Sequence, residues 1–200
     1  MEYFQYGEKE IAYLKSKDKL LGEAIDSIGI IKREVNPDLF IGLVYNIVGQ
    51  QISAKATKTV WNRFLVKFGQ ITPGVLVNTD INEIQQLGVS FRKANYIKEI
   101  ANKVNSKELI IEELYDLSDD EVIKRLTTLP GIGVWTAEML LIFSMNRMDV
   151  LSWGDLAIRR GIMNLYRHKT LDKKRFERYR KRYSPYGSVA SLYLWEISKQ

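Results

Sequence analysis

Helix-start signals recur along this 200-residue chain, and each precedes apolar residues at helical spacing. Asn36-Pro37 has the order of an N-cap followed by proline at the first helical position. Ser53 and Ser90 precede two more such segments, and Ser118-Asp119-Asp120-Glu121 is a capping box, in which serine and glutamate satisfy each other's backbone donors. Sustained alternation of apolar and polar residues is absent from the sequence, so it predicts an all-α protein.

Composition excludes several kinds of chemistry. The chain has no cysteine and a single histidine, His168, so disulfides, thiolate zinc sites, an iron–sulfur cluster, cysteine nucleophiles and a Ser-His-Asp triad are excluded. We expect His168 to be a surface or packing residue. Catalysis would rest on carboxylates, lysine, tyrosine, hydroxyl or backbone groups. A net charge of +6 fits a polyanionic partner.

Nothing in the sequence predicts a membrane span or a signal peptide. No apolar run approaches the roughly 20 residues that a bilayer requires. The first residues mix acidic and aromatic side chains and have no apolar core of the kind that a secretory signal has. We therefore expect no membrane partner and a cytoplasmic location, associated with the nucleoid in a prokaryote, or the nucleus in a eukaryote.

The most informative segment is Leu129-Pro130-Gly131-Ile132-Gly133, which joins the helix after Ser118 to a helix predicted over 134–145. Two glycines permit a tight turn with positive φ and the close approach of another backbone. The N-terminus of the following helix suits a phosphate oxygen. Because no side chain there would read a base, such a turn would anchor DNA without specifying its sequence. The alternative is an αα-hairpin whose glycines serve packing alone.

This hairpin resembles that of the helix-hairpin-helix DNA glycosylases, and the resemblance extends from residue 37 to 195. Asp149–Gly161 resembles the family's loop and helix with the catalytic aspartate, and Gly49–Ser53 resembles the loop that enters the minor groove. Leu87–Ala94 and Pro185–Ala190 are similar to segments of the alkylpurine branch, that of 3-methyladenine DNA glycosylase II.

The resemblance implies that Asp155 is the catalytic carboxylate, which would stabilise positive charge on the sugar and orient water. Without the resemblance, an aspartate near a helix start is simply an N-cap. Asp149 is the nearby competitor, for which a role at the start of the loop fits better. The resemblance further implies that Gln51 is the wedge filling the gap left by an extruded base, with Gln50 and Ile52 beside it. The alternative for this segment is a polar interhelical loop.

Trp135 occupies the place where lyase relatives have a Schiff-base lysine, two residues after the second hairpin glycine. This difference implies a monofunctional enzyme that uses water and leaves an abasic site. The resemblance also assigns Trp135, Met139 and Trp195 to the base pocket, where an indole face attracts a cationic alkylated purine by about 0.5–2 kcal/mol. Many relatives have tyrosine in place of Met139. Core packing is the alternative for either tryptophan.

The hairpin is further expected to contact the DNA backbone through three residues, Gly131, Gly133 and Thr136. The family often holds one monovalent cation, Na⁺ or K⁺, on hairpin carbonyls that bridge to a phosphate. The matching carbonyls here are those of Thr127, Leu129 and Ile132. We expect no required cofactor and no iron–sulfur cluster.

The resemblance predicts two helical lobes, one over 37–147 with the hairpin and one from 1–36 plus 148–200, with Asp155 in the cleft between them. We expect no N-terminal β domain and a monomeric protein. The predicted function is excision of alkylated purines, of the 3-methyladenine and 7-methylguanine type, from double-stranded DNA. Three alternatives are open: a glycosylase of the same fold for uracil, hypoxanthine or a mismatched base, a non-catalytic DNA-binding module that uses only the hairpin, and an all-helical interaction protein. The basic run 173–182 is expected to be a solvated helix face with at most partial phosphate contact.

Overall fold

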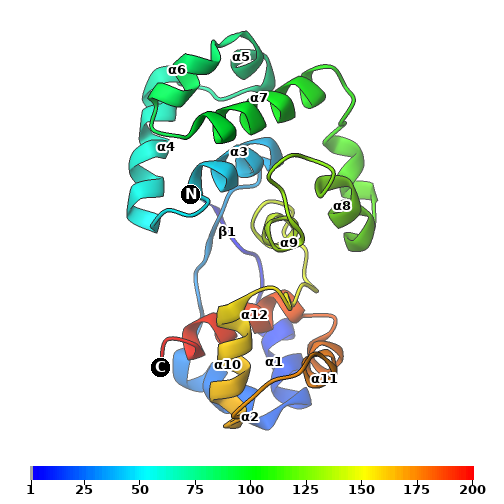
Figure 1. The fold of residues 1–200 in the computed structure, drawn as a ribbon. Helices are drawn as coiled ribbons and strands as arrows, with labels where there is room; N and C mark the ends of the chain where they lie inside the picture. Colours follow the sequence, from blue (N-terminus) through cyan, green and yellow to red (C-terminus); the bar gives the residue numbers. More distant parts are fainter. Residues whose placement is uncertain (1) are drawn as a thin grey trace. The chain divides into compact units, whose positions relative to one another are not determined.

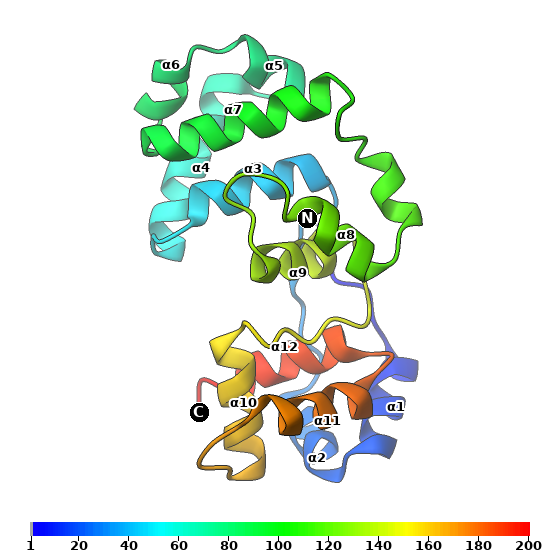
Figure 2. The same ribbon diagram turned by 45° about the vertical axis from the view of Figure 1, so that its right-hand side comes forward.

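The computed structural model describes residues 2–200 and confirms the all-α prediction (Figures 1 and 2). Across these residues the chain forms twelve α-helices, one short 3₁₀ helix and two strands of two residues each. The strands β1 (Glu2–Tyr3) and β2 (Glu34–Val35) pair antiparallel. Strands this short contain no alternation for the sequence pattern to reveal.

The chain divides into two compact units. One is continuous, Asn36–Leu140, and the other combines the residues up to Val35 with Leu141–Gln200. Compared with the expected lobes, 37–147 and 1–36 plus 148–200, the second boundary lies seven residues earlier, so 141–147 belong to the discontinuous unit.

The continuous unit is built on α7 (Phe91–Asn105). Against α7 pack α3 (Leu39–Gly49), α5 (Pro73–Asn78) and α6 (Ile81–Gln86), and α4 (Ala54–Phe68) packs on α3. The 3₁₀ helix η1 (Glu112–Asp116) and α8 (Asp119–Leu126) follow, and α9 (Val134–Phe143) runs across the boundary between the two units.

The predicted helix caps can be compared with the structure one by one. The side chains of Ser53, Ser90 and Ser118 each accept a hydrogen bond from the backbone N–H three residues on, as predicted. The prediction for Asn36 was wrong, because Asp38 is the N-cap of α3 and accepts from the Ile41 N–H at 3.0 Å. The Asn36 side chain instead accepts from the Asp38 N–H at 3.2 Å, which makes a turn that precedes the helix.

The discontinuous unit is arranged around α12 (Gly187–Ile197), which is buried along nearly its whole length. A Cβ at Gly161 would lie 2.2 Å from the Leu194 carbonyl oxygen, so the glycine allows α10 (Leu156–Tyr166) to pack directly on α12. The other helices of this unit, α1 (Glu8–Lys17), α2 (Lys19–Ile28) and α11 (Lys173–Tyr183), also contact α12. A helix covered from several sides is apolar all round, which explains the weak amphipathic pattern of 187–197.

A polar cluster around the buried carboxylate of Asp18 joins three helices of this unit. Asp18 accepts from the Leu21 N–H at 3.0 Å, from the Tyr166 hydroxyl at 2.6 Å and from Arg182 at 2.5 Å. Burial raises the pKa of the Asp18 carboxyl, but these hydrogen bonds outweigh burial and hold it below its ordinary value. His168 stacks on Tyr166, which agrees with its predicted role as a packing residue.

Candidate functional site

The loop from Asp149 to Asp155 is fixed to the start of α12 by hydrogen bonds. The Asp149 carboxylate accepts from the Gly187 N–H at 3.1 Å. Val150 donates its N–H to the Ser188 hydroxyl at 2.9 Å, and its carbonyl accepts from the Ser191 hydroxyl at 3.0 Å. Asp149 therefore has the loop-start role predicted for it. These bonds also hold the segment 185–190, which is distant in sequence, against the loop.

Asp155 is buried, with 7% of its surface exposed, and it is the N-cap of α10. Its Oδ1 accepts from the backbone N–H groups of Ala157 at 2.8 Å and Ile158 at 2.9 Å. Its Oδ2 accepts from the indole N–H of Trp195 at 3.2 Å. The N-cap alternative is therefore geometrically correct, and it is compatible with a catalytic role because the helix N-terminus favours a negative charge at this point.

Trp195 belongs to an aromatic surface beside Asp155. Its ring stacks on Phe143, with centroids 5.6 Å apart and an interplanar angle of 26°. The exposed guanidinium of Arg33 lies 5.3 Å from the Phe143 centroid and 5.9 Å from that of Trp195. Sequence reasoning missed Phe143 and Arg33, since one was part of an apolar helix and the other a lone basic residue. The contact of the guanidinium with both rings shows that this aromatic face attracts a planar cation.

The hairpin between α8 and α9 uses its two glycines differently. Gly131 has φ +78°, and a Cβ there would lie 2.5 Å from the Tyr96 ring. At Gly133 φ is not positive, and a Cβ would meet nothing within 4 Å. The fold itself therefore requires the first glycine, whereas the second leaves an open approach to the N-terminus of α9.

Within α9 the first helical hydrogen bond runs from the Ala137 N–H to the Gly133 carbonyl at 3.0 Å. The first N–H groups of an α-helix point beyond its N-terminus, where they suit a phosphate oxygen. The Thr136 side chain is buried, so its predicted contact with DNA rests on its backbone.

Trp135 and Met139 differ sharply in exposure. Trp135 is 46% exposed in the first turn of α9, whereas Met139, one turn later, is 5% exposed. Both belong to the continuous unit, while Asp155 and Trp195 belong to the other unit. The pocket roles of Trp135, Met139 and Trp195 stay predictions.

The three carbonyls expected to hold a monovalent cation lie in the connection between α8 and α9. The Leu129 carbonyl accepts from the Ile132 N–H at 3.2 Å, which closes the turn and leaves the oxygen one lone pair. A cation on these carbonyls stays a prediction. Among residues 2–200, no group of three or more histidine, aspartate or glutamate side chains is placed to hold a metal ion.

The predicted wedge, Gln51, is exposed at the tip of a tight turn between α3 and α4. The Ile52 N–H donates to the Gly49 carbonyl at 3.4 Å, with Gln50 at φ −57° and ψ 132° and Gln51 at φ +58°. These angles are those of a type II turn, whose third residue is usually glycine or asparagine. Gln51 is therefore a glutamine held in the left-handed region.

The structure and the sequence motifs together define a class of protein. The chain belongs to the HhH-GPD superfamily of base excision DNA repair proteins, whose family model matches residues 44–185. The resemblance read from the hairpin is thereby confirmed. In the part of the chain that the structure describes, no helix is long and apolar enough to cross a membrane.

Several named relatives of the chain are 3-methyladenine DNA glycosylases. The chain is 36% identical over 186 residues to DNA-3-methyladenine glycosylase 1 of Schizosaccharomyces pombe, covering 90% of this chain and 80% of that protein. A crystal structure of DNA-3-methyladenine glycosidase from Bacillus halodurans has a TM-score of 0.87 at 36% identity, covering 99% of this chain and 93% of that one. The S. pombe 3-methyladenine DNA glycosylase in complex with abasic DNA has a TM-score of 0.82 at 32% identity, with 96% and 98% of the two chains covered.

Proposed function

We propose that this protein is a monofunctional DNA glycosylase of base excision repair that releases alkylated purines from double-stranded DNA. The observation that carries the proposal is the buried Asp155 carboxylate, oriented by two backbone N–H groups and by the Trp195 indole beside an aromatic surface. The relatives named above are glycosylases or glycosidases for 3-methyladenine, which supports the same substrate class here.

The chemistry follows from charge. Cleavage of the N-glycosidic bond develops positive charge on the sugar, and a preorganised carboxylate stabilises this charge without having to reorient. Asp155 is preorganised because its hydrogen bonds fix both oxygens. An alkylated purine such as 3-methyladenine or 7-methylguanine is cationic and already a good leaving group, so modest contacts suffice, and Trp135, Met139 and Trp195 are the side chains that we expect to make them.

Water is the nucleophile in this proposal. Trp135 stands where a lyase would have its Schiff-base lysine, and tryptophan has no amine that could attack the sugar. The product is an abasic site in an uncleaved strand. No cofactor takes part, and Na⁺ or K⁺ on the carbonyls of Thr127, Leu129 and Ile132 would only add positive charge near a phosphate.

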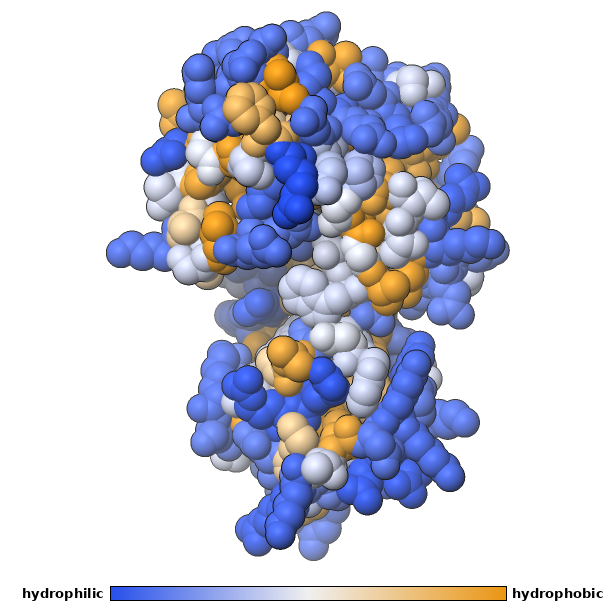
Figure 3. Space-filling view, viewed as in Figure 1, coloured by the Kyte–Doolittle hydropathy of each residue, from blue (hydrophilic) through white to orange (hydrophobic). Residues whose placement is uncertain are grey.

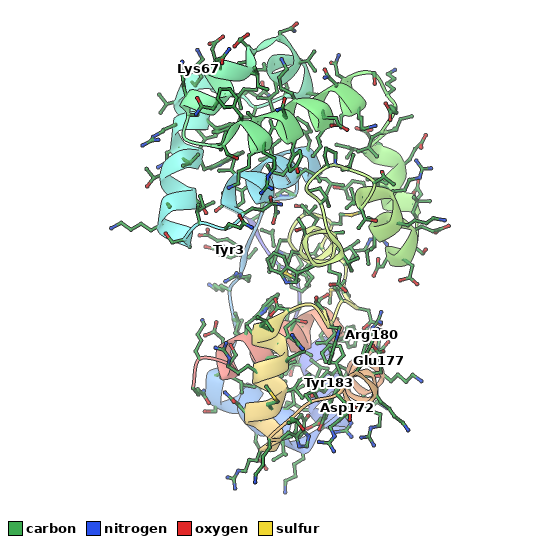
Figure 4. The ribbon with its side chains drawn as sticks, in the orientation of Figure 1. Tyr3, Lys67, Asp172, Glu177, Arg180 and Tyr183 are labelled. Carbon is green, nitrogen blue, oxygen red and sulfur yellow. The ribbon has the colours of Figure 1, made fainter. Side chains whose placement is uncertain are left out.

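Charge distribution supports DNA as the partner. Helix α11 contains seven basic side chains and one acidic, so its net charge equals the +6 of the whole chain. The acidic residue, Glu177, lies beside Arg180 at 3.8 Å (Figure 4), and the surface at the place of α11 is hydrophilic in Figure 3. Phe176, Tyr179 and Tyr183 are buried on the other face of the helix.

We expect a monomer that works where genomic DNA is, in the cytoplasmic nucleoid or in a nucleus.

The test is release of free base from defined duplexes. DNA containing 3-methyladenine or 7-methylguanine is incubated with the protein beside duplexes containing uracil or hypoxanthine. We expect release of the alkylated purines, with abasic sites that break only on heating in alkali. Release of uracil or hypoxanthine in their place would assign the fold to another lesion, and binding without release would make the protein a DNA-binding module.

A further inference from the structure

The turn that presents Gln51 contains stored backbone strain. A non-glycine residue with positive φ costs about 1–2 kcal/mol and persists only where surrounding contacts hold it. Gln51 has φ +58° and an exposed side chain, so its own contacts do not hold it. The contacts that do are made by its neighbours in the chain.

Lys93 holds this turn from α7. Its Nζ donates to the Val48 carbonyl at 2.9 Å and to the Gln50 carbonyl at 2.6 Å. The first is a last-turn carbonyl of α3, which has no partner within the helix, and the second belongs to the peptide that leads into Gln51. One ammonium group thereby fixes the end of the helix and the plane of the peptide before the strained residue.

The same turn is tied to the hairpin. The side-chain amide of Gln50 donates to the Gly131 carbonyl at 2.7 Å. Tyr96, one turn after Lys93 on α7, packs its ring against the face of Gly131 where a side chain would be. Helix α7 therefore supports the Gln51 turn through Lys93 and the hairpin turn through Tyr96, and Gln50 links the two. All of these residues lie within the continuous unit.

We propose that Lys93 is a positioning residue for base extrusion, which holds the Gln51 turn in register with the DNA-anchoring hairpin. This inference rests on the proposed function, since a wedge is needed only by an enzyme that takes a base out of the duplex. Base extrusion costs a few kcal/mol for a paired base and less for a weakly paired one. A displaced wedge should therefore slow excision of a paired lesion and spare that of an unpaired one.

The experiment compares two duplexes that differ only opposite the lesion. 7-Methylguanine is placed opposite cytosine in one and opposite an abasic analogue in the other, and single-turnover excision rates are measured for wild type and Lys93→Met. Lys93→Met removes both hydrogen bonds, and we expect the paired-to-unpaired rate ratio to fall about tenfold, the effect of the one bond, to the Gln50 carbonyl, that fixes the peptide before Gln51. A loss of stability alone would lower both rates together.

Lys98 provides a matched control. It lies on the same helix, and its Nζ also donates to two carbonyls, those of Val77 at 3.0 Å and Thr79 at 2.5 Å, at the end of α5. Lys98→Met removes the same kind of interaction away from both turns, so it should leave the rate ratio unchanged. In a Gln51→Gly background, Lys93→Met should add no further loss, because Lys93 acts through Gln51.

The outcomes separate the two proposals. Wild-type protein that releases base from neither duplex would overturn the proposed function. An active wild type whose ratio is unchanged in Lys93→Met, or is lowered equally by Lys98→Met, would overturn the positioning role. Should Lys93→Met not fold, Gln50→Leu removes the link to Gly131, and an unchanged ratio in that variant would equally count against the inference.

Discussion

Replacing Asp155 by asparagine separates its structural role from its proposed chemical role. Asparagine is as good an N-cap as aspartate, so its carbonyl oxygen can keep both bonds to the N–H groups of Ala157 and Ile158. The amide NH₂ then faces the Trp195 indole N–H across 3.2 Å, donor against donor.

The expected cost in stability is small. Losing one hydrogen bond costs about 1 kcal/mol, and losing the negative charge at a helix N-terminus costs about 0.3–1 kcal/mol. The sum, about 1–2 kcal/mol, is well below the roughly 5–15 kcal/mol that stabilise a domain. Asp155→Asn should therefore fold, bind duplex DNA as well as wild type or better, and unfold at a slightly lower denaturant concentration.

The expected loss of activity is much larger. Removing one preorganised electrostatic group from an active site typically lowers kcat by about 10²–10³-fold, or roughly 2.7–4 kcal/mol. The assay is single-turnover release of 7-methylguanine, with chemical denaturation measured on the same samples. Asp172→Asn is the control, because Asp172 also caps a helix in this unit, accepting from the Arg175 N–H at 2.7 Å. Release by Asp155→Asn at or near the wild-type rate would refute the catalytic assignment.

Three further predictions concern the hairpin, the nucleophile and pH. Gly131→Ala should destabilise the protein by about 1–2 kcal/mol, because residue 131 has a positive φ and a Cβ there would meet the Tyr96 ring. Gly133→Ala should unfold like wild type but bind DNA more weakly, which titration of a labelled duplex would measure. Borohydride added during turnover should trap no protein–DNA adduct, since Trp135 offers no amine, and a trapped adduct would contradict hydrolysis by water. Asp18→Asn should destabilise the protein at neutral pH, and the difference should shrink as pH falls below about 4, because the folded state lowers the pKa of Asp18; a difference independent of pH in urea titrations would contradict this.

Local features of the chain were predictable from the sequence alone. Ser53, Ser90 and Ser118 cap helices where predicted, since an N-cap needs only its own side chain and a backbone N–H three residues on. The hairpin was equally visible, because its turn depends on residues next to one another. The one wrong cap prediction, Asn36, has the same local cause. Asn36 and Asp38 are both good N-cap residues two positions apart, and only the structure shows that the helix begins after Asp38.

The candidate site was predictable only in part. Asp155 was identified from the resemblance, and absent cysteine and a lone histidine had removed most competing catalytic groups. Its hydrogen bond to Trp195, 40 positions away, and the Arg33 guanidinium over the same aromatic surface needed the structure. The sequence marked the segment containing Lys93 as typical of the family but assigned it no role.

Sequence by itself therefore predicted several of the helices and the hairpin, excluded thiol chemistry, and, through the family resemblance, indicated a candidate catalytic carboxylate. Tertiary structure decided how these parts support one another. The link from Gln50 to Gly131 spans 81 positions and that from Lys93 to Val48 spans 45. The physical reason is that capping and turn formation use neighbouring atoms, whereas the orientation of a carboxylate or a strained turn depends on side chains that meet only after the helices have packed.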